Sequence, residues 1–203
     1  MTLRIIGLAG RKGSGKSYVA LLAEEAVVRD HKRSHRRNKL YVVTKSFAAP
    51  VKEMLEALPF DQDEIEARLY GDMKEEPEHL ILSGMSMRDA MQTLATIWGR
   101  GLNPNIWLDC MRQALLEVER VDDADNRIVI IDDVRFENEV AFIKSLRGVV
   151  LAVRSDTEET GYAHVSEQLD LGQFASITNN RASAGNLAKQ LTDLTPYSFT
   201  AAS

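Results

Sequence analysis

The sequence predicts an α/β protein built on a parallel sheet that helices cover on both sides. Short, apolar runs such as Ile5–Ala9 and Ile128–Ile131 alternate along the chain with segments of helical periodicity. Strands that are apolar on both faces are typical of a parallel sheet buried between helices. The 203 residues, 44% of them hydrophobic, suffice for one compact domain. We therefore predict a single domain over residues 1–203.

The individual elements follow from apolar spacing and from turn residues. A glycine-rich loop interrupts the first apolar run, and a helical pattern begins near Lys16. Pro50 suits the first turn of a helix, where its missing N–H leaves no bond unmade. Residues 59–86 are polar and turn-rich, so we expect an excursion there rather than a core element. Further elements are expected as strands over Leu40–Phe47, Gly148–Val153 and Ala175–Thr178, and as helices over Met87–Trp98, Asn105–Val118 and Ala184–Leu194.

The charge balance argues against nucleic acid as the main partner. The chain holds 25 Lys and Arg against 30 Asp and Glu, a formal net charge of −5, whereas proteins that hold polyanions usually carry a basic surplus. No signal sequence is evident and no run approaches 18 apolar residues. We expect no membrane association and a cytoplasmic protein. A homodimer is left open.

A complete phosphate-binding motif lies between the first strand and the first helix. In such a loop, glycines let successive backbone N–H groups turn toward phosphate oxygens at the positive end of the helix. The lysine is expected to bridge the β- and γ-phosphates of ATP, and the serine hydroxyl to bind Mg²⁺. The match to G-x-x-x-x-G-K-[ST] consists of Gly10, Arg11, Lys12, Gly13, Ser14, Gly15, Lys16 and Ser17.

A second acidic signal follows the apolar strand Ile128–Ile131, which ends in Asp132 and Asp133. The carboxyl ends of parallel strands open onto the ligand site, where a carboxylate can hold the magnesium shell opposite Ser17. Strand periodicity does not decide which aspartate faces the metal.

Arg135 lies two residues beyond these aspartates. There a guanidinium could bind an acceptor phosphate, or the phosphate being transferred, through paired hydrogen bonds. The alternative is an arginine at a helix start that pairs with Glu139, four residues further on.

Four segments together resemble one family. They are Phe47–Met54, Tyr70–Pro77, Met91–Arg100 and Asp133–Glu139. With them, the chain is similar to phage deoxynucleoside monophosphate kinases, whose relatives include animal phosphomevalonate kinases, from about residue 3 to residue 191. These motifs are far more specific than the phosphate-binding loop alone. If a phage encodes the chain, we expect it in the host cytoplasm.

The resemblance implies the nucleoside monophosphate kinase fold of the P-loop NTP hydrolase class. It implies an acceptor-binding region over about residues 46–107 and a lid over about residues 154–170. The metal role would fall more to Asp133 than to Asp132, because Asp133 occupies the family's aspartate position. Catalytic roles are implied for Lys16, Arg100, Asp133 and Arg135, acceptor binding for Lys52, Arg88, Gln92, Arg100, Trp107 and Arg135, and adenine contact for the loop at Asn179.

One departure from the resemblance concerns the lid. Such kinases commonly carry lid arginines, but Ser155–Asp170 contains none. Either Arg154, Arg11 and Lys12 take over that role or the lid contributes little.

The expected reaction is ATP- and Mg²⁺-dependent phosphorylation of a deoxynucleoside 5′-monophosphate to the diphosphate. Two alternatives are a P-loop kinase for another phosphorylated metabolite and a nucleotide-binding regulatory ATPase. Which base the enzyme accepts is left open.

Overall fold

A computed structural model describes residues 2–33, 39–121, 124–155 and 169–179, together with 186, 189–191 and 193. The chain divides into two compact units. Residues 1–46 and 114–203 form one, called here the sheet unit, and residues 47–113 form the other, called here the inserted unit.

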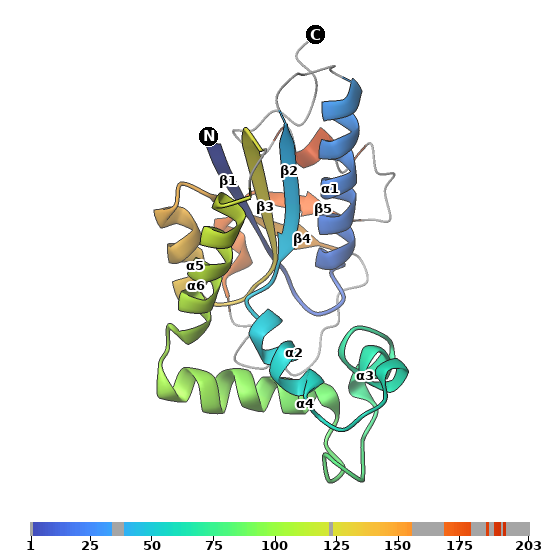
Figure 1. Cartoon of the computed structure of the whole chain (residues 1–203). Coiled ribbons are helices and arrows are strands. Elements are labelled where there is room, and N and C mark those ends of the chain that lie inside the picture. Colours follow the sequence, from blue (N-terminus) through green and yellow to red (C-terminus); the bar gives the residue numbers. More distant parts are fainter. Residues whose placement is uncertain are drawn as a thin grey trace. The chain divides into compact units, whose positions relative to one another are not determined.

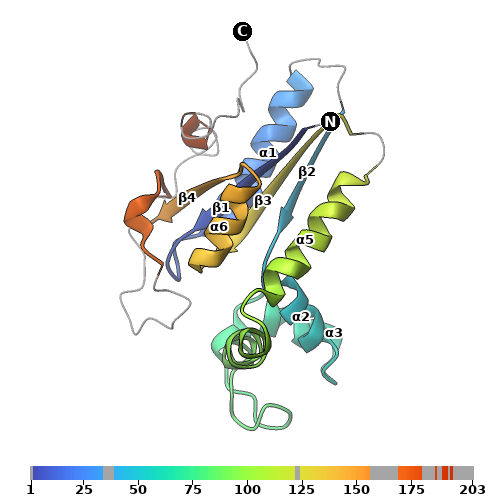
Figure 2. The ribbon, with the colours of Figure 1, turned by 90° about the vertical axis from the view of Figure 1, so that its left-hand side faces the viewer.

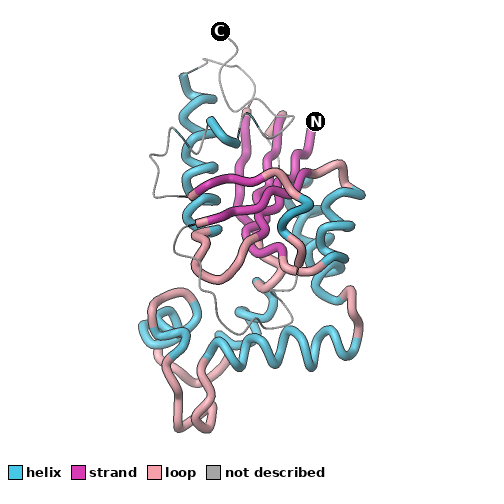
Figure 3. The backbone as a smooth tube through the Cα atoms, turned by 180° about the vertical axis from the view of Figure 1, so that it is seen from behind, coloured by secondary structure: helices cyan, strands magenta, loops and turns pink. Residues whose placement is uncertain are grey.

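The sheet unit is built on a parallel sheet of five strands in the order β2-β3-β1-β4-β5. Every neighbouring pair in this order is parallel. Figure 1 draws the strands as arrows and Figure 3 shows them in magenta. The strands that form it are β1 (Thr2–Ala9), β2 (Leu40–Lys45), β3 (Asn126–Val134), β4 (Val149–Arg154) and β5 (Ser176–Thr178).

Helices cover the two faces of this sheet. Helix α1 (Lys16–Arg33) lies on one face and α6 (Glu137–Ser145) on the other (Figures 1 and 2). The buried side chain of Arg127 in β3 donates to the carbonyl oxygens of Val118 and Val121. These bonds attach the C-terminal end of α5 (Ile106–Glu119) to the sheet. The predicted α/β fold with a parallel, helix-covered sheet is confirmed.

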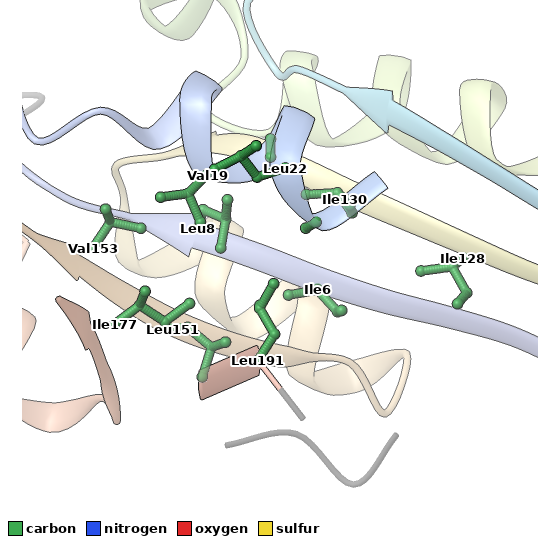
Figure 4. Close-up of a cluster of buried hydrophobic side chains, with 12 residues drawn as sticks. Ile6, Leu8, Val19, Leu22, Ile128, Ile130, Leu151, Val153, Ile177 and Leu191 are labelled. Carbon is green, nitrogen blue, oxygen red and sulfur yellow. The ribbon is translucent and has the colours of Figure 1, made fainter. Parts of the chain in front are cut away.

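One face of the sheet packs a continuous apolar core against α1 (Figure 4). Alternate residues of each strand point to the same face, so Ile6 and Leu8 of β1 meet the helix while Ile5 faces away. The burial of both faces of the sheet explains why Ile5–Ala9 in β1 and Ile128–Ile131 in β3 are unbroken apolar runs. The core holds Ile6, Leu8, Val19, Ala20, Leu22, Ala23, Ile128, Ile130, Leu151, Val153, Ile177 and Leu191.

The inserted unit is helical. Pro50 occupies the first turn of its first helix, as predicted. Its elements are α2 (Ala49–Glu56), α3 (Gln62–Leu69), the short 3₁₀-helix η1 (Met73–Glu75), α4 (Met87–Gln92), the π-helix η2 (Thr93–Arg100) and the first part of α5.

Helix α3 lies within residues 59–86, where the sequence predicted an excursion from the core but no particular helix. Asp61 caps it by accepting a hydrogen bond from the Glu64 N–H at 2.8 Å. Ile65 and Leu69, four residues apart, are both buried. Two apolar residues on a single turn are too weak a pattern to stand out among acidic neighbours, which explains the miss.

The predicted helix Met87–Trp98 changes to π geometry at Thr93. The Trp107 indole N–H donates to the carbonyl oxygen of Ala95 at 2.8 Å. The ring also packs so closely on Gly99 that a Cβ there would lie 2.2 Å from a ring carbon. A side-chain donor inserted into a helical hydrogen-bond ladder is a recognised cause of such distortion.

The buried Glu78 carboxylate organises the loop before α4. It accepts backbone hydrogen bonds from Leu80, Ile81 and Leu82 at 2.9, 2.6 and 2.7 Å. These bonds, the one from Leu82 first, lower the pKa of Glu78, since they favour its charged form.

Candidate active site

The loop between β1 and α1 has the backbone conformation that its glycines permit. Gly13 and Gly15 both adopt φ of 79°, a region that side chains disfavour. A Cβ on Gly10 would lie 2.6 Å from Ser14 Oγ and 2.7 Å from the carbonyl oxygen of Val153. The loop is therefore compact, with Ser14 fully buried at its centre.

Lys16, the first residue of α1, folds back over this loop. Its Nζ donates to the carbonyl oxygens of Gly10 at 2.8 Å and Arg11 at 2.9 Å. The ammonium charge is thus held at the loop rather than along the helix.

Two serine–aspartate hydrogen bonds surround the carboxyl end of β3. Ser17 Oγ donates to Asp132 Oδ2 at 2.9 Å, and Ser46 Oγ donates to Asp133 Oδ2 at 2.6 Å. The pairing of β3 with β1 shifts register between Ile131 and Val134, so the two aspartates lie in a local irregularity of the strand, and each has a different serine partner. The structure places Asp132 beside Ser17, whereas the resemblance favoured Asp133 for the metal.

Asn179 lies directly after β5 and reaches the phosphate-binding loop. Its Nδ2 donates to the carbonyl oxygen of Ser14 at 3.0 Å, and its backbone N–H donates to that of Arg154 at 2.7 Å. The side chain is buried, and its Oδ1 has no hydrogen-bond partner within the described part of the chain.

Arg135 follows β3 and precedes α6. Its backbone N–H and that of Phe136 both donate to Glu139 Oε2, at 2.7 and 3.1 Å. Through these two bonds the Glu139 carboxylate, which is only 2% exposed, caps the start of α6. The bonds fix the backbone position from which the Arg135 side chain extends.

The other acceptor-side candidates lie in the inserted unit. Lys52 Nζ lies 4.3 Å from the centre of the Tyr70 ring, and Arg88 forms an ion pair with Glu75. Arg100 donates to the carbonyl oxygen of Pro104 at 3.2 Å. Gln92, the last residue of α4, is half-buried.

Trp107 and Tyr70 make contacts that stabilise the inserted unit. Trp107 is 4% exposed and its indole nitrogen is bonded to a backbone carbonyl, so packing against the π-helix accounts for it. The Tyr70 hydroxyl donates to Glu56 at 2.7 Å. Burial, followed by this contact with Glu56, raises the pKa of Tyr70 to about 12.

The structure therefore brings the phosphate-binding loop, Asp132 and Asn179 together within the sheet unit. Ser46 was missed by the sequence reasoning. Its signal was a hydroxyl near the carboxyl end of the predicted strand Leu40–Phe47, where parallel strand ends meet. Most of the expected lid, 156–168, lies outside the described residues, and Arg154 at its start is exposed.

Within the described ranges, no group of three or more His, Cys, Asp and Glu side chains is placed to hold a metal ion. None of the helices described is both long and apolar enough to cross a membrane.

Comparison with known proteins identifies the family. The sequence profile of deoxynucleotide monophosphate kinases matches residues 40–191. A protein of Acanthamoeba polyphaga mimivirus that is named as a deoxynucleotide monophosphate kinase is 31% identical over 173 residues, which span 80% of each chain. A solved sugar kinase from Janibacter sp. covers 96% of this chain and 97% of its own at 13% identity, but with a TM-score of 0.30 it supports no argument about fold.

The profile match and the viral relative confirm the resemblance found in the motifs. Kinases of this kind are phosphotransferases that act on a small nucleotide. The chain belongs to the deoxynucleotide monophosphate kinase family.

Proposed function

We propose that this enzyme transfers the γ-phosphate of ATP, with Mg²⁺, to a deoxynucleoside 5′-monophosphate and forms the diphosphate. The observation that carries the proposal is the hydrogen bond from Ser17 of the phosphate-binding loop to Asp132 at the end of β3. This hydrogen bond joins the phosphate-binding motif to the acidic pair that follows the apolar strand.

The residues of the phosphate-binding loop fit a nucleoside triphosphate. The positive φ of Gly13 and Gly15 is the conformation that turns backbone N–H groups into an anion-binding nest. Lys16 already holds its ammonium at the loop.

Ser17 and Asp132 fit a magnesium ion. Mg²⁺ prefers oxygen ligands and is usually held by one or two carboxylates together with substrate phosphates and water. A hydroxyl and a carboxylate within 2.9 Å of each other supply such ligands. When bound, the ion would neutralise charge on the phosphates. Asp133, held by Ser46, would support the arrangement from the neighbouring position.

For phosphoryl transfer, the protein mainly aligns the two substrates and stabilises the charge of the transition state. The attacking oxygen belongs to the acceptor's own phosphate, which is ionised near neutral pH, so no strong general base is required. Lys16 and Arg135 would stabilise the charge on the phosphate in transfer. Lys52, Arg88, Gln92 and Arg100 would bind the acceptor monophosphate.

A panel of acceptors tests this proposal. Purified enzyme is incubated with ATP, Mg²⁺ and either a deoxynucleoside monophosphate, a ribonucleoside monophosphate or phosphomevalonate, and ADP formation is measured. We expect ADP to form with one or more deoxynucleoside monophosphates and not with phosphomevalonate, and to need Mg²⁺. ADP formation that is independent of any acceptor would instead indicate a regulatory ATPase. A preference for phosphomevalonate would move the enzyme to another acceptor class.

A further inference from the structure

We propose that Asn179 is a positioning residue for the phosphate-binding loop, whose side-chain N–H sets the orientation of the peptide between Ser14 and Gly15. This role differs from the contact with adenine that the family resemblance implies for the same segment. It rests on the proposed function, in which that loop binds the nucleotide.

Both ends of Asn179 are fixed. Its backbone N–H is bonded to the Arg154 carbonyl at 2.7 Å, and its Nδ2 to the Ser14 carbonyl, 165 residues away in sequence, at 3.0 Å. The residue is 7% exposed, so water cannot readily replace either bond. Only the NH₂ end of the amide can face Ser14, because the opposite orientation would set two acceptor oxygens together.

Gly15 shows how closely the amide approaches the loop. A Cβ on Gly15 would lie 2.2 Å from Asn179 Nδ2. Gly15 also has φ of 79°. The glycine is therefore needed here for two reasons, its backbone conformation and the space that Asn179 occupies.

This contact determines where a neighbouring N–H points. The described chain contains no cis peptide bond, and in a trans peptide the C=O and N–H point in opposite directions. With the Ser14 carbonyl held toward Asn179, the Gly15 N–H must point away from it. Backbone N–H groups of this loop are the proposed phosphate donors. Losing the bond from Asn179 lets this peptide rotate and weakens the nest.

Gln190 provides a matched control. Its amide bonds both the N–H and the carbonyl of Thr178, at 2.9 and 3.4 Å. It thus steadies the end of β5 one residue before Asn179, and no hydrogen bond described for it reaches the phosphate-binding loop.

The experiment measures nucleotide affinity and kinetics in Asn179→Leu, Asn179→Ala and Gln190→Met. ADP with Mg²⁺ is titrated by calorimetry, KM is determined for ATP and for the monophosphate, and melting is followed so that all assays are run well below each Tm. We expect both Asn179 variants to bind ADP about fivefold to tenfold more weakly, as the loss of one hydrogen bond allows. KM for ATP rises with it, while KM for the monophosphate changes by less than about twofold. Gln190→Met lowers Tm but leaves ADP affinity within about twofold.

A second measurement uses the contact with Gly15. Gly15→Ala weakens ADP binding in the wild-type background by strain and by collision with Asn179. In the Asn179→Ala background the collision is gone, so the additional loss is expected to be smaller by about threefold or more. Equal losses in the two backgrounds would count against the contact.

The outcomes separate this inference from the proposed function. If wild-type protein does not bind ADP, the proposed function fails and takes the inference with it. If wild type binds ADP and folded Asn179 variants bind it equally well, the inference alone is wrong. It is also overturned if Gln190→Met loses as much affinity as Asn179→Leu, because the effect would then come from the stability of β5.

Discussion

Ser17 Oγ donates a hydrogen bond to Asp132 Oδ2 at 2.9 Å across 115 residues of sequence. The neighbouring Asp133 accepts instead from Ser46 at 2.6 Å. Two adjacent carboxylates thus have different partners. This difference divides their proposed roles between direct magnesium binding and support.

Asp132→Asn is expected to raise the Mg²⁺ concentration for half-maximal activity by about 10-fold or more. Asparagine keeps the shape but removes the charge beside Ser17. Asp133→Asn is expected to have the smaller effect, because its carboxylate accepts from Ser46, whereas that of Asp132 accepts from Ser17, the proposed magnesium ligand of the loop. Magnesium titrations of both variants decide the matter. A larger defect in Asp133→Asn would restore the assignment that the family motif favours.

Lys16→Ala is expected to lower kcat by at least about 100-fold, since the ammonium is needed most where charge develops in the transition state. Lys144→Ala serves as the control, because Lys144 lies on α6 with its Nζ 5.6 Å from the centre of the Phe174 ring. Turnover is measured at saturating ATP and acceptor. Near-normal turnover of folded Lys16→Ala would mean that the loop is not the catalytic centre.

Arg100→Lys and Arg135→Lys are each expected to lower kcat/KM for the monophosphate while KM for ATP changes little. Lysine keeps the charge but lacks the planar fork that pairs with two phosphate oxygens. Steady-state kinetics with each substrate varied in turn measures this. Arg120→Lys, at an exposed position after α5, is the control. Wild-type acceptor constants in both variants would place the acceptor site elsewhere.

Gly99→Ala and Gly101→Ala are expected to change stability in opposite directions. A Cβ on Gly99 collides with Trp107, whereas one on Gly101 meets nothing within 4 Å. We expect Gly99→Ala to destabilise the fold by about 1–3 kcal/mol and Gly101→Ala to stabilise it by about 0.5–1 kcal/mol. Urea unfolding of both variants measures the difference. Equal effects would mean that Trp107 does not pack on Gly99 in solution.

Glu78 predicts a pH dependence of stability. Its pKa is lowered in the folded state from an ordinary 4.5, so its charged form stabilises the fold above that value. This contribution is lost as the pH falls from 4.5 through the lower folded-state pKa. Glu78→Gln, which cannot ionise, should therefore show a shallower loss of stability below pH 4.5. Urea unfolding across this pH range tests it, and equal slopes would assign the acid sensitivity to other carboxylates.

The sequence by itself determined the sheet and the phosphate-binding loop. The segments Ile5–Ala9 of β1 and Ile128–Ile131 of β3 are fully apolar because both of their faces are buried, and so strong a pattern can be recognised without a structure. The phosphate-binding loop could likewise be predicted from the sequence, since its glycines and lysine act through local backbone geometry. The family motifs added the nature of the reaction.

Only the tertiary structure decided which residues meet. The pairing of Ser17 with Asp132, of Ser46 with Asp133 and of Asn179 with Ser14 depends on strand order and register. Local periodicity carries no information on contacts between residues far apart in the sequence. The π-helix was hidden for the same reason, because it involves the approach of Trp107 to Gly99 and the Ala95 carbonyl from another helix. Asp132 and Asp133 lie where the pairing of β3 with β1 shifts register, so the fold, and not the strand pattern, determines the partner of each.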